Sequence, residues 1–107
     1  MSNLETIVKE CLNIPCVKEG QAIMDGSFIL SPYMANSLRG SGSPQSISLS
    51  SSIDLFYTSK EDAVEQGLKL FTELCSTSGV SCQEPDFTYE NEAHYWRTTL
   101  LVQEVIK

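Results

Sequence analysis

A run of alternating side chains between residues 47 and 57 constrains the fold of this chain more than any other feature. Apolar side chains recur there at alternate positions, and small polar ones stand between them. The apolar set is Ile47, Leu49, Ile53, Leu55 and Tyr57, and the polar set is Ser48, Ser50, Ser52 and Asp54. Only Ser51 and Phe56 break the pattern. This period predicts a long β-strand with one buried face, which needs neighbouring strands and a covering layer.

An amphipathic helix is predicted near the N-terminus. It starts at the capping box Ser2–Glu5 and ends before Pro15, because the residue before a proline resists helical angles. Its apolar stripe consists of Leu4, Ile7, Val8, Cys11 and Leu12. The helical spacing of this stripe predicts that the helix packs one side on a sheet.

A second helix is predicted to begin after Thr58 or Ser59 as the N-cap and to stop at Gly79. Its predicted apolar stripe consists of Val64, Leu68, Phe71, Leu74 and Cys75. Gly67 lies on this stripe, where glycine costs a helix about 1 kcal/mol relative to alanine. We therefore expect the helix backbone to lie close against a sheet at that point.

Turn signals predict the remaining strands. Gln21–Met24 and Ser27–Leu30 flank Asp25–Gly26, a dipeptide suited to a two-residue hairpin turn. Pro32 interrupts the second of these segments, and Tyr33–Leu38 is predicted to resume as an edge strand, since proline cannot donate to a central ladder.

The segment Arg39–Ser46 is rich in glycine and serine, which predicts a flexible loop. A closing antiparallel hairpin is predicted from Asp86–Tyr89 and His94–Ile106, joined across Glu90–Glu92. Both faces of its last strand carry apolar residues. Trp96, Leu100, Val102 and Ile106 are on one face, and Tyr95, Leu101 and Val105 are on the other. We expect one face to join the core and the other to be available to a partner.

These elements predict one domain over residues 1–107. A chain of this length, 41% hydrophobic and 20% charged, has the composition of a folded domain. The predicted fold class is α+β, with a single two-layer architecture: a mostly antiparallel sheet of about four to five strands with two helices packed on it.

The charge balance argues against a surface that grips phosphates, because the formal net charge is -7. The chain shows neither a long apolar span nor the basic and apolar start of a secretory signal. We therefore expect it to remain in the cytoplasm where it is made.

The residues that most often carry chemistry form no recognisable catalytic or metal-binding pattern. Cys11 and Cys16 are separated by four residues and Cys75 and Cys82 by six, which is not the spacing of paired zinc knuckles. Cys11 and Cys75 are predicted to be buried on helix stripes, whereas Cys16 and Cys82 are predicted in loops, where a reactive thiol is the alternative to a structural one.

His94 has acidic neighbours in sequence but no nucleophile motif beside it, so a surface histidine is favoured over a catalytic one. The acidic side chains of Glu84, Asp86, Glu90 and Glu92 lack the glycine-bearing spacing of a calcium loop. The sequence therefore predicts no enzyme activity, no catalytic residues, no metal and no cofactor.

Interface residues are the more informative prediction, because Trp, Tyr and Arg dominate binding hot spots. Trp96 shares the predicted core face, which leaves Tyr89, Tyr95 and Arg97 as interface candidates. The turn at Asp25 and Gly26 is a second candidate patch, and Arg39 at the start of the Gly/Ser loop is a third.

Several short segments resemble the tail-terminator, or tail-to-head joining, group of small tail-completion proteins from long-tailed bacteriophages and prophages. These segments are Pro32-Tyr33, Ile53–Thr58 followed by Lys60-Glu61, and Thr88–Thr99. The resemblance implies a structural protein that forms a ring, typically a hexamer, on the end of the tail tube and joins the tube to head connector proteins. DNA would pass through such a ring without specific binding. The protein would be found in the cytoplasm of the bacterial host during assembly and then in the virion tail.

Two other readings stay open. The chain could be another head-tail joint or minor tail component of similar build, which would differ in its position along the virion. It could also be an α+β binding module or small enzyme unrelated to phages, which would predict a monomer or dimer with a concave pocket.

Overall fold

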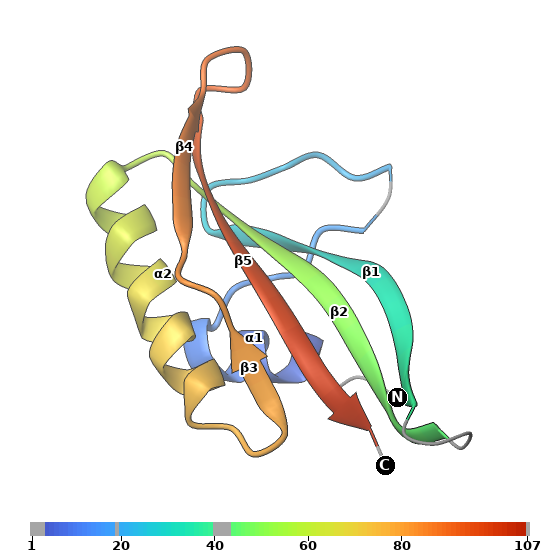
Figure 1. Ribbon diagram of the computed structural model, residues 1–107. Coiled ribbons are helices and arrows are strands. Elements are labelled where there is room, and N and C mark those ends of the chain that lie inside the picture. The colour runs from blue at the N-terminus through green and yellow to red at the C-terminus, as the bar shows by residue number, and fades with distance from the viewer. Residues whose placement is uncertain (1–3, 19, 40–43, 107) are drawn as a thin grey trace.

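The computed structural model describes residues 4–18, 20–39 and 44–106, with side chains described for residues 4–18, 20–31 and 49–104. The elements in chain order are α1 (Leu4–Leu12), β1 (Ser27–Arg39), β2 (Pro44–Tyr57), α2 (Lys60–Cys75), β3 (Val80–Cys82), β4 (Asp86–Glu90) and β5 (Tyr95–Ile106) (Figure 1). Two helices on a five-stranded antiparallel sheet confirm the predicted α+β class.

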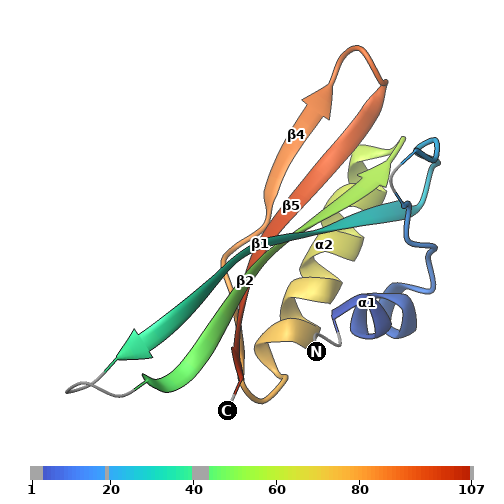
Figure 2. The same cartoon turned by 90° about the vertical axis from the view of Figure 1, so that its right-hand side faces the viewer.

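The sheet has the order β1-β2-β5, and β4 and β3 follow one another along the far side of β5. The described strands pair with one another antiparallel. Both helices lie on the same side of this sheet (Figure 2). The opposite side, which we call the outer face, carries neither helix.

The core lies between the helices and the sheet. It contains fully buried side chains from both helices and from three strands: Leu4, Val8, Leu70, Leu74, Phe28, Ile53, Leu55 and Leu100. The predicted stripe of the first helix is confirmed, because Leu4, Val8 and Leu12 are buried and Ile7 packs against them. The capping serine at position 2 lies outside the described residues.

The N-cap of α2 is Ser59, whose hydroxyl accepts a hydrogen bond from the Asp62 N–H at 3.4 Å. The predicted stripe of this helix was partly wrong: Leu68 is 48% exposed and Cys75 is exposed. Ala63, Gly67, Leu70 and Leu74 are the residues buried against the sheet. Because the small residues Ala63 and Gly67 face the sheet, the backbone of α2 lies close to the strands. This confirms the expectation for Gly67.

A Cβ placed on Gly67 would lie 2.7 Å from Thr98 Cγ2 and 3.1 Å from a Phe87 ring carbon. The Thr98 hydroxyl also donates a hydrogen bond to the Ala63 carbonyl across the same contact. Gly79 is not the helix stop that we predicted. The helix ends at Cys75 with Ser76 as its C-cap, and Gly79, at φ 78°, belongs to the turn that leads into β3, a strand the sequence did not predict.

The predicted hairpin around Asp25–Gly26 was wrong, because Gln21–Met24 is not a strand. The turn itself is present, with Gly26 at φ 74°, but it leads into β1 and is fixed to the end of β2. The Asp25 carboxylate accepts from the Thr58 N–H, and the Gly26 N–H donates to the Phe56 carbonyl. The distant end of β2 therefore determines the conformation of this turn.

β1 runs through Pro32 as a single edge strand, with a register shift between Pro32 and Met34. This confirms an edge position for the proline. The predicted loop Arg39–Ser46 was too wide, because Arg39 and Pro44–Ser46 belong to β1 and β2. Its central residues 40–43 lie outside the described residues.

The chain between α1 and β1, residues 13–18 and 20–26, passes around the free edge of β1. We call this segment the strap. It is held to the edge by the Phe28 N–H, which donates to the Pro15 carbonyl, and by the Val17 N–H, which donates to the Phe28 carbonyl. Its far end reaches the outer face, where the Tyr95 hydroxyl donates to the Ile23 carbonyl at 3.2 Å. The strap therefore connects the helix side of the sheet to one end of the outer face.

The closing hairpin is confirmed as the antiparallel pair β4 and β5. His94 does not start the strand as predicted. It lies in the turn at φ 58°, and its N–H donates to the Glu90 carbonyl.

Candidate functional site

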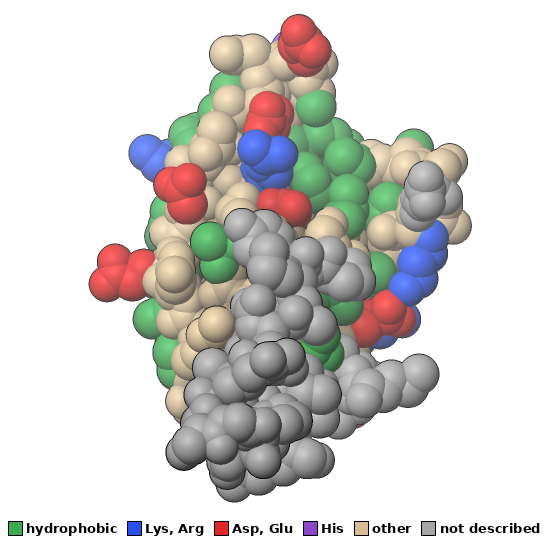
Figure 3. All heavy atoms as spheres, turned by 45° about the vertical axis from the view of Figure 1, so that its right-hand side comes forward, with side chains coloured by type: hydrophobic (Ala, Val, Ile, Leu, Met, Phe, Trp, Pro, Cys, Tyr) green, Lys and Arg blue, Asp and Glu red, His purple; other side chains and the backbone are tan. Residues whose placement is uncertain are grey.

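The outer face is the best candidate for a functional surface, because it is the side of the sheet that neither helix covers. Strand register places on it Ile29, Ser31, Ser50, Ser52, Asp54, Phe56, Ser81, Asp86, Thr88, Glu90, Tyr95, Arg97, Thr99, Leu101 and Gln103. In Figure 3 acidic and basic side chains lie close together beside a group of hydrophobic side chains.

Two predicted interface residues, Tyr95 and Arg97, lie on this face. The Arg97 Nη2 forms an ion pair with the Glu90 Oε1 at 2.8 Å, and its Nε is buried without a hydrogen-bond partner in the described part of the chain. The Tyr95 ring packs edge-on against Phe56, with ring centroids 6.4 Å apart. Phe56 is only 6% exposed although it points away from the helices. Tyr95 thus helps to cover the apolar end of the outer face.

The rest of the described outer face is mostly polar and uncharged. The Thr99 hydroxyl donates to the Asp54 carboxylate at 2.7 Å, which fixes two neighbouring strands side by side. Further along β5, Leu101 is 41% exposed. It lines a hollow of about 430 Å³ that extends from the β3 edge across β5 to Ser50 and Ser51 of β2, together with polar side chains that include Ser81, Gln83 and Gln103.

A second hollow, of about 640 Å³, lies at the opposite edge of the sheet, between β1 and the strap. Leu30 and Ser31 line it from β1, and Lys18 and Ile23 line it from the strap. Lys18 forms an ion pair with Glu5 of α1 at 2.5 Å, and Lys9 bonds the same carboxylate at 3.0 Å. These two bonds lower the pKa of Glu5 to about 2.

The other predicted interface residues do not join Tyr95 and Arg97. Tyr89 belongs to the helix side of β4, where its ring lies 5.3 Å from that of Trp96 and Lys60 Nζ lies 5.4 Å from the Trp96 centroid. Asp25 and Gly26 are engaged with the end of β2, as described above. Arg39 ends β1 opposite Pro44, and its side chain lies outside the described set.

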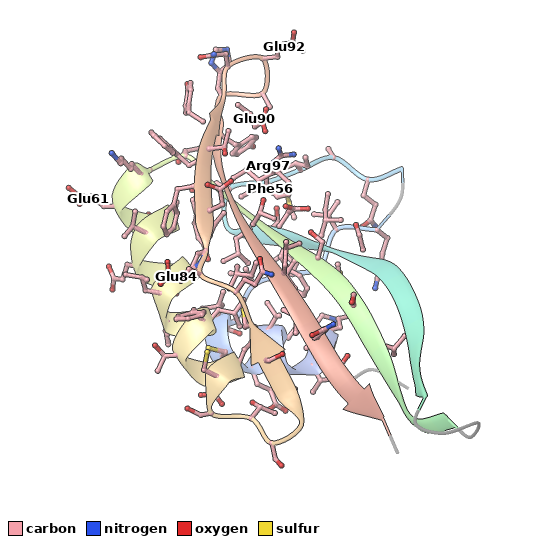
Figure 4. All side chains as sticks on the ribbon, viewed as in Figure 1. Phe56, Glu61, Glu84, Glu90, Glu92 and Arg97 are labelled. Carbon is pink, nitrogen blue, oxygen red and sulfur yellow. The ribbon has the colours of Figure 1, made fainter. Side chains whose placement is uncertain are left out.

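The acidic residues considered as a cation site are spread along the β4–β5 hairpin, from the connection before β4 to the hairpin turn. Figure 4 shows Glu92 at the tip of the β4–β5 hairpin, Glu84 near the connection from β3 to β4, and Glu90 beside Arg97. Among the described residues, no group of three His, Cys, Asp or Glu side chains could hold a metal ion. His94 is exposed in the hairpin turn.

The four cysteines are free thiols. Cys11, Cys16 and Cys82 are half-buried, but Cys75 is exposed, so its predicted burial was wrong. Cys82 lies in β3 and not in a loop. Burial raises the pKa of the Cys82 thiol to about 11, with a smaller effect from Cys75, so this thiol stays protonated and weakly nucleophilic at neutral pH.

Tyr57 is the other unusual titratable group. Its ring belongs to the core and it is 7% exposed, yet its hydroxyl has no hydrogen-bond partner among the described residues. Burial, with smaller effects from the Asp62 and Asp25 carboxylates, raises the pKa of Tyr57 to about 12.

Sequence reasoning missed both hollows at the sheet edges. Their lining residues come together only through the register of β1, β2, β5 and β3, and β3 was not predicted. The one available signal was the exposed face of the alternating strand, whose serines Ser50 and Ser52 leave room beside Leu101.

No described helix is both long and apolar enough to cross a membrane. The chain matches no known protein-family model and no curated protein.

Proposed function

We propose that this chain is a structural component of a phage or prophage tail, similar to tail terminators, which assembles as a ring of identical subunits. In this role it caps the tail tube and joins it to head connector proteins. The proposal starts from the resemblance of Ile53–Thr58 and Thr88–Thr99 to that group.

The observation that carries the proposal is the open sheet, which has a different edge on each side. β1 ends the strand order on one side, and β3 and β4 end it on the other. A cyclic ring needs two different complementary patches on each subunit, because its contacts are heterologous. Unpaired strand edges are ready templates for a second chain. A single sheet with two unlike edges therefore offers each subunit two different patches for such contacts.

The charge distribution supports a passage for DNA without specific binding. The chain has a net charge of -7, and three of its few basic side chains, Lys9, Lys18 and Arg97, are already engaged with carboxylates. Such a surface repels phosphates and leaves few free cations to hold them.

The test is the solution mass of the full chain, measured by light scattering over a wide range of protein concentrations and at two salt concentrations, with negative-stain images of the same fractions. The proposal predicts a species several times the 11.9 kDa subunit mass, with a central hole in the images. A monomer up to the highest concentration, or a compact dimer, would contradict it.

A further inference from the structure

Beyond the ring itself, the register of the strands indicates which parts of two subunits meet. Ser31 of β1 pairs with Ser52 of β2, and Ser52 pairs with Leu101 of β5. The Gln83 N–H, just after β3, donates to the Leu101 carbonyl at 3.0 Å. Ser31 and Gln83 therefore lie at the same level of the sheet, on opposite edges.

Both edges are open at this level. The strap pairs with the free edge of β1 around Phe28, through the Cys16–Phe28 bridge. Beyond this bridge, no described segment pairs with that edge of β1. On the other side, β3 pairs only with β5 within the described chain. Each open edge lies beside one of the two hollows, with Ser31 in the hollow of β1 and Gln83 in that of β3.

The directions of β1 and β3 also allow the two edges to pair. Three successive antiparallel pairings, β1 with β2, β2 with β5 and β5 with β3, make β1 and β3 run in opposite directions. A rotation about an axis along the strands leaves their direction unchanged. The β3 edge of one copy, brought beside the β1 edge of the next by such a rotation, would therefore continue the antiparallel sheet.

The charges beside the two edges also permit two copies to meet there. Lys18 lines the β1 hollow with its side chain 59% exposed, and Glu84, which is exposed, follows Gln83 at the β3 edge. The residues between them on the two edges, Leu30, Ser31, Ser81 and Gln83, are uncharged. Lys18 is paired with Glu5, which lines the same hollow, so the β1 edge presents an ion pair to the exposed Glu84 of the facing edge. Two copies of an acidic chain can therefore approach there with little like-charge repulsion.

We infer that neighbouring subunits join by adding the β3 edge of one copy to the β1 edge of the next, with Gln83 against Ser31. This inference rests on the proposed ring and specifies its contact. Backbone hydrogen bonds would supply part of the attraction, as in other strand additions, although Pro32 next to Ser31 offers a carbonyl and no N–H. The two hollows would receive the side chains of the facing edge.

Chemical cross-linking tests the contact. Ser31→Cys protein labelled with ¹⁵N is mixed with unlabelled Gln83→Cys protein, treated with a short bismaleimide, and analysed by peptide mass spectrometry. Isotope labels identify links between different chains. Wild-type protein gives the background from the native cysteines, and Ser31→Cys mixed with Thr88→Cys, an exposed position on β4, is the matched control. Thermal melting of each variant checks that the fold is intact.

The expected result is a mixed-isotope link between positions 31 and 83 and at least tenfold less linking between positions 31 and 88. Rings of wild-type protein without the 31–83 link would overturn this contact but leave the proposed function standing. The 31–83 link in open chains without closed rings would support the contact and overturn the ring. A wild-type protein that neither assembles nor yields this link would overturn both.

Discussion

At the scale of single residues, Tyr57 is a buried side chain whose ring stabilises the core and whose hydroxyl does not. Because the hydroxyl is buried without a described partner, its desolvation is uncompensated. We predict that Tyr57→Phe leaves the free energy of unfolding unchanged or raises it by about 1 kcal/mol. Urea denaturation at pH 8 checks this. A loss of more than about 1 kcal/mol would mean that the hydroxyl has a stabilising partner.

The raised pKa of Tyr57 adds a pH dependence. The ordinary pKa is 10.0 and the folded value is about 12, so the native state holds this proton more tightly than the unfolded state. The free energy of unfolding of wild type therefore keeps its full value below pH 10, where this hydroxyl is protonated in both states, and falls as the pH rises toward 12. We predict that the stability advantage of Tyr57→Phe over wild type grows between pH 10 and pH 12. An advantage that stays constant over this range would be evidence against the raised pKa.

Gly67 tests the closeness of α2 to the sheet. Alanine is the better helix former, but its Cβ would meet Thr98 Cγ2 at 2.7 Å. We predict that Gly67→Ala lowers the free energy of unfolding by about 1 to 3 kcal/mol, as overpacking does. Lys69→Ala on the exposed side of the same helix is the control, with an expected change within about 0.5 kcal/mol. A stabilised Gly67→Ala would show that the helix stands further from β5.

At the scale of elements, the orientation of α2 can be measured with two leucines two positions apart. Leu70 is fully buried and Leu68 is 48% exposed. We predict that Leu70→Ala costs about 2 to 5 kcal/mol of unfolding free energy, and that Leu68→Ala costs less than about 1 kcal/mol. Chemical denaturation of both variants is the measurement. A larger loss for Leu68→Ala than for Leu70→Ala would return the helix to the orientation that the sequence predicted.

Glu5 connects α1 to the strap through Lys9 and Lys18. Its pKa falls from 4.5 to about 2, so the contribution of this carboxylate to stability is present above pH 4.5 and is lost as the pH falls toward 2. We predict that Glu5→Gln is less acid-sensitive than wild type in this window. The difference should shrink at high salt, because the group is exposed. Parallel acid-denaturation curves for the two proteins would refute the assignment.

The sequence predicts elements whose patterns are local. The alternation over Ile47–Tyr57 and the closing hairpin are confirmed because each strand carries its own buried face. The part of the strap at Gln21–Met24 was wrongly predicted as a strand, because the conformation there depends on bonds to Thr58 and Tyr95, 33 and 72 positions away from their partners. Tyr95 and Arg97 could be placed opposite the core from period two alone, whereas the hollows depend on register across the whole sheet.

At the scale of the whole molecule, two exposed leucines can show whether subunits meet through the sheet or through the helix side. Leu101 lies in the hollow at the β3 edge and Leu68 lies on α2, with 41% and 48% exposure. We predict that Leu101→Asp raises the concentration for half-assembly at least tenfold, because a charge would enter a desolvated contact. Leu68→Asp should leave it within about twofold. Light scattering against concentration measures both, and equal effects would place the interface elsewhere.

We propose that identical subunits close into a ring through unlike edges of one sheet. The most direct test of this proposal is a cryo-electron microscopy reconstruction of the species assembled by the full chain. We expect cyclic symmetry around an open hole, with β1 of each subunit beside β3 of the next. A two-fold dimer joined through equivalent surfaces, with both sheet edges exposed, would contradict it.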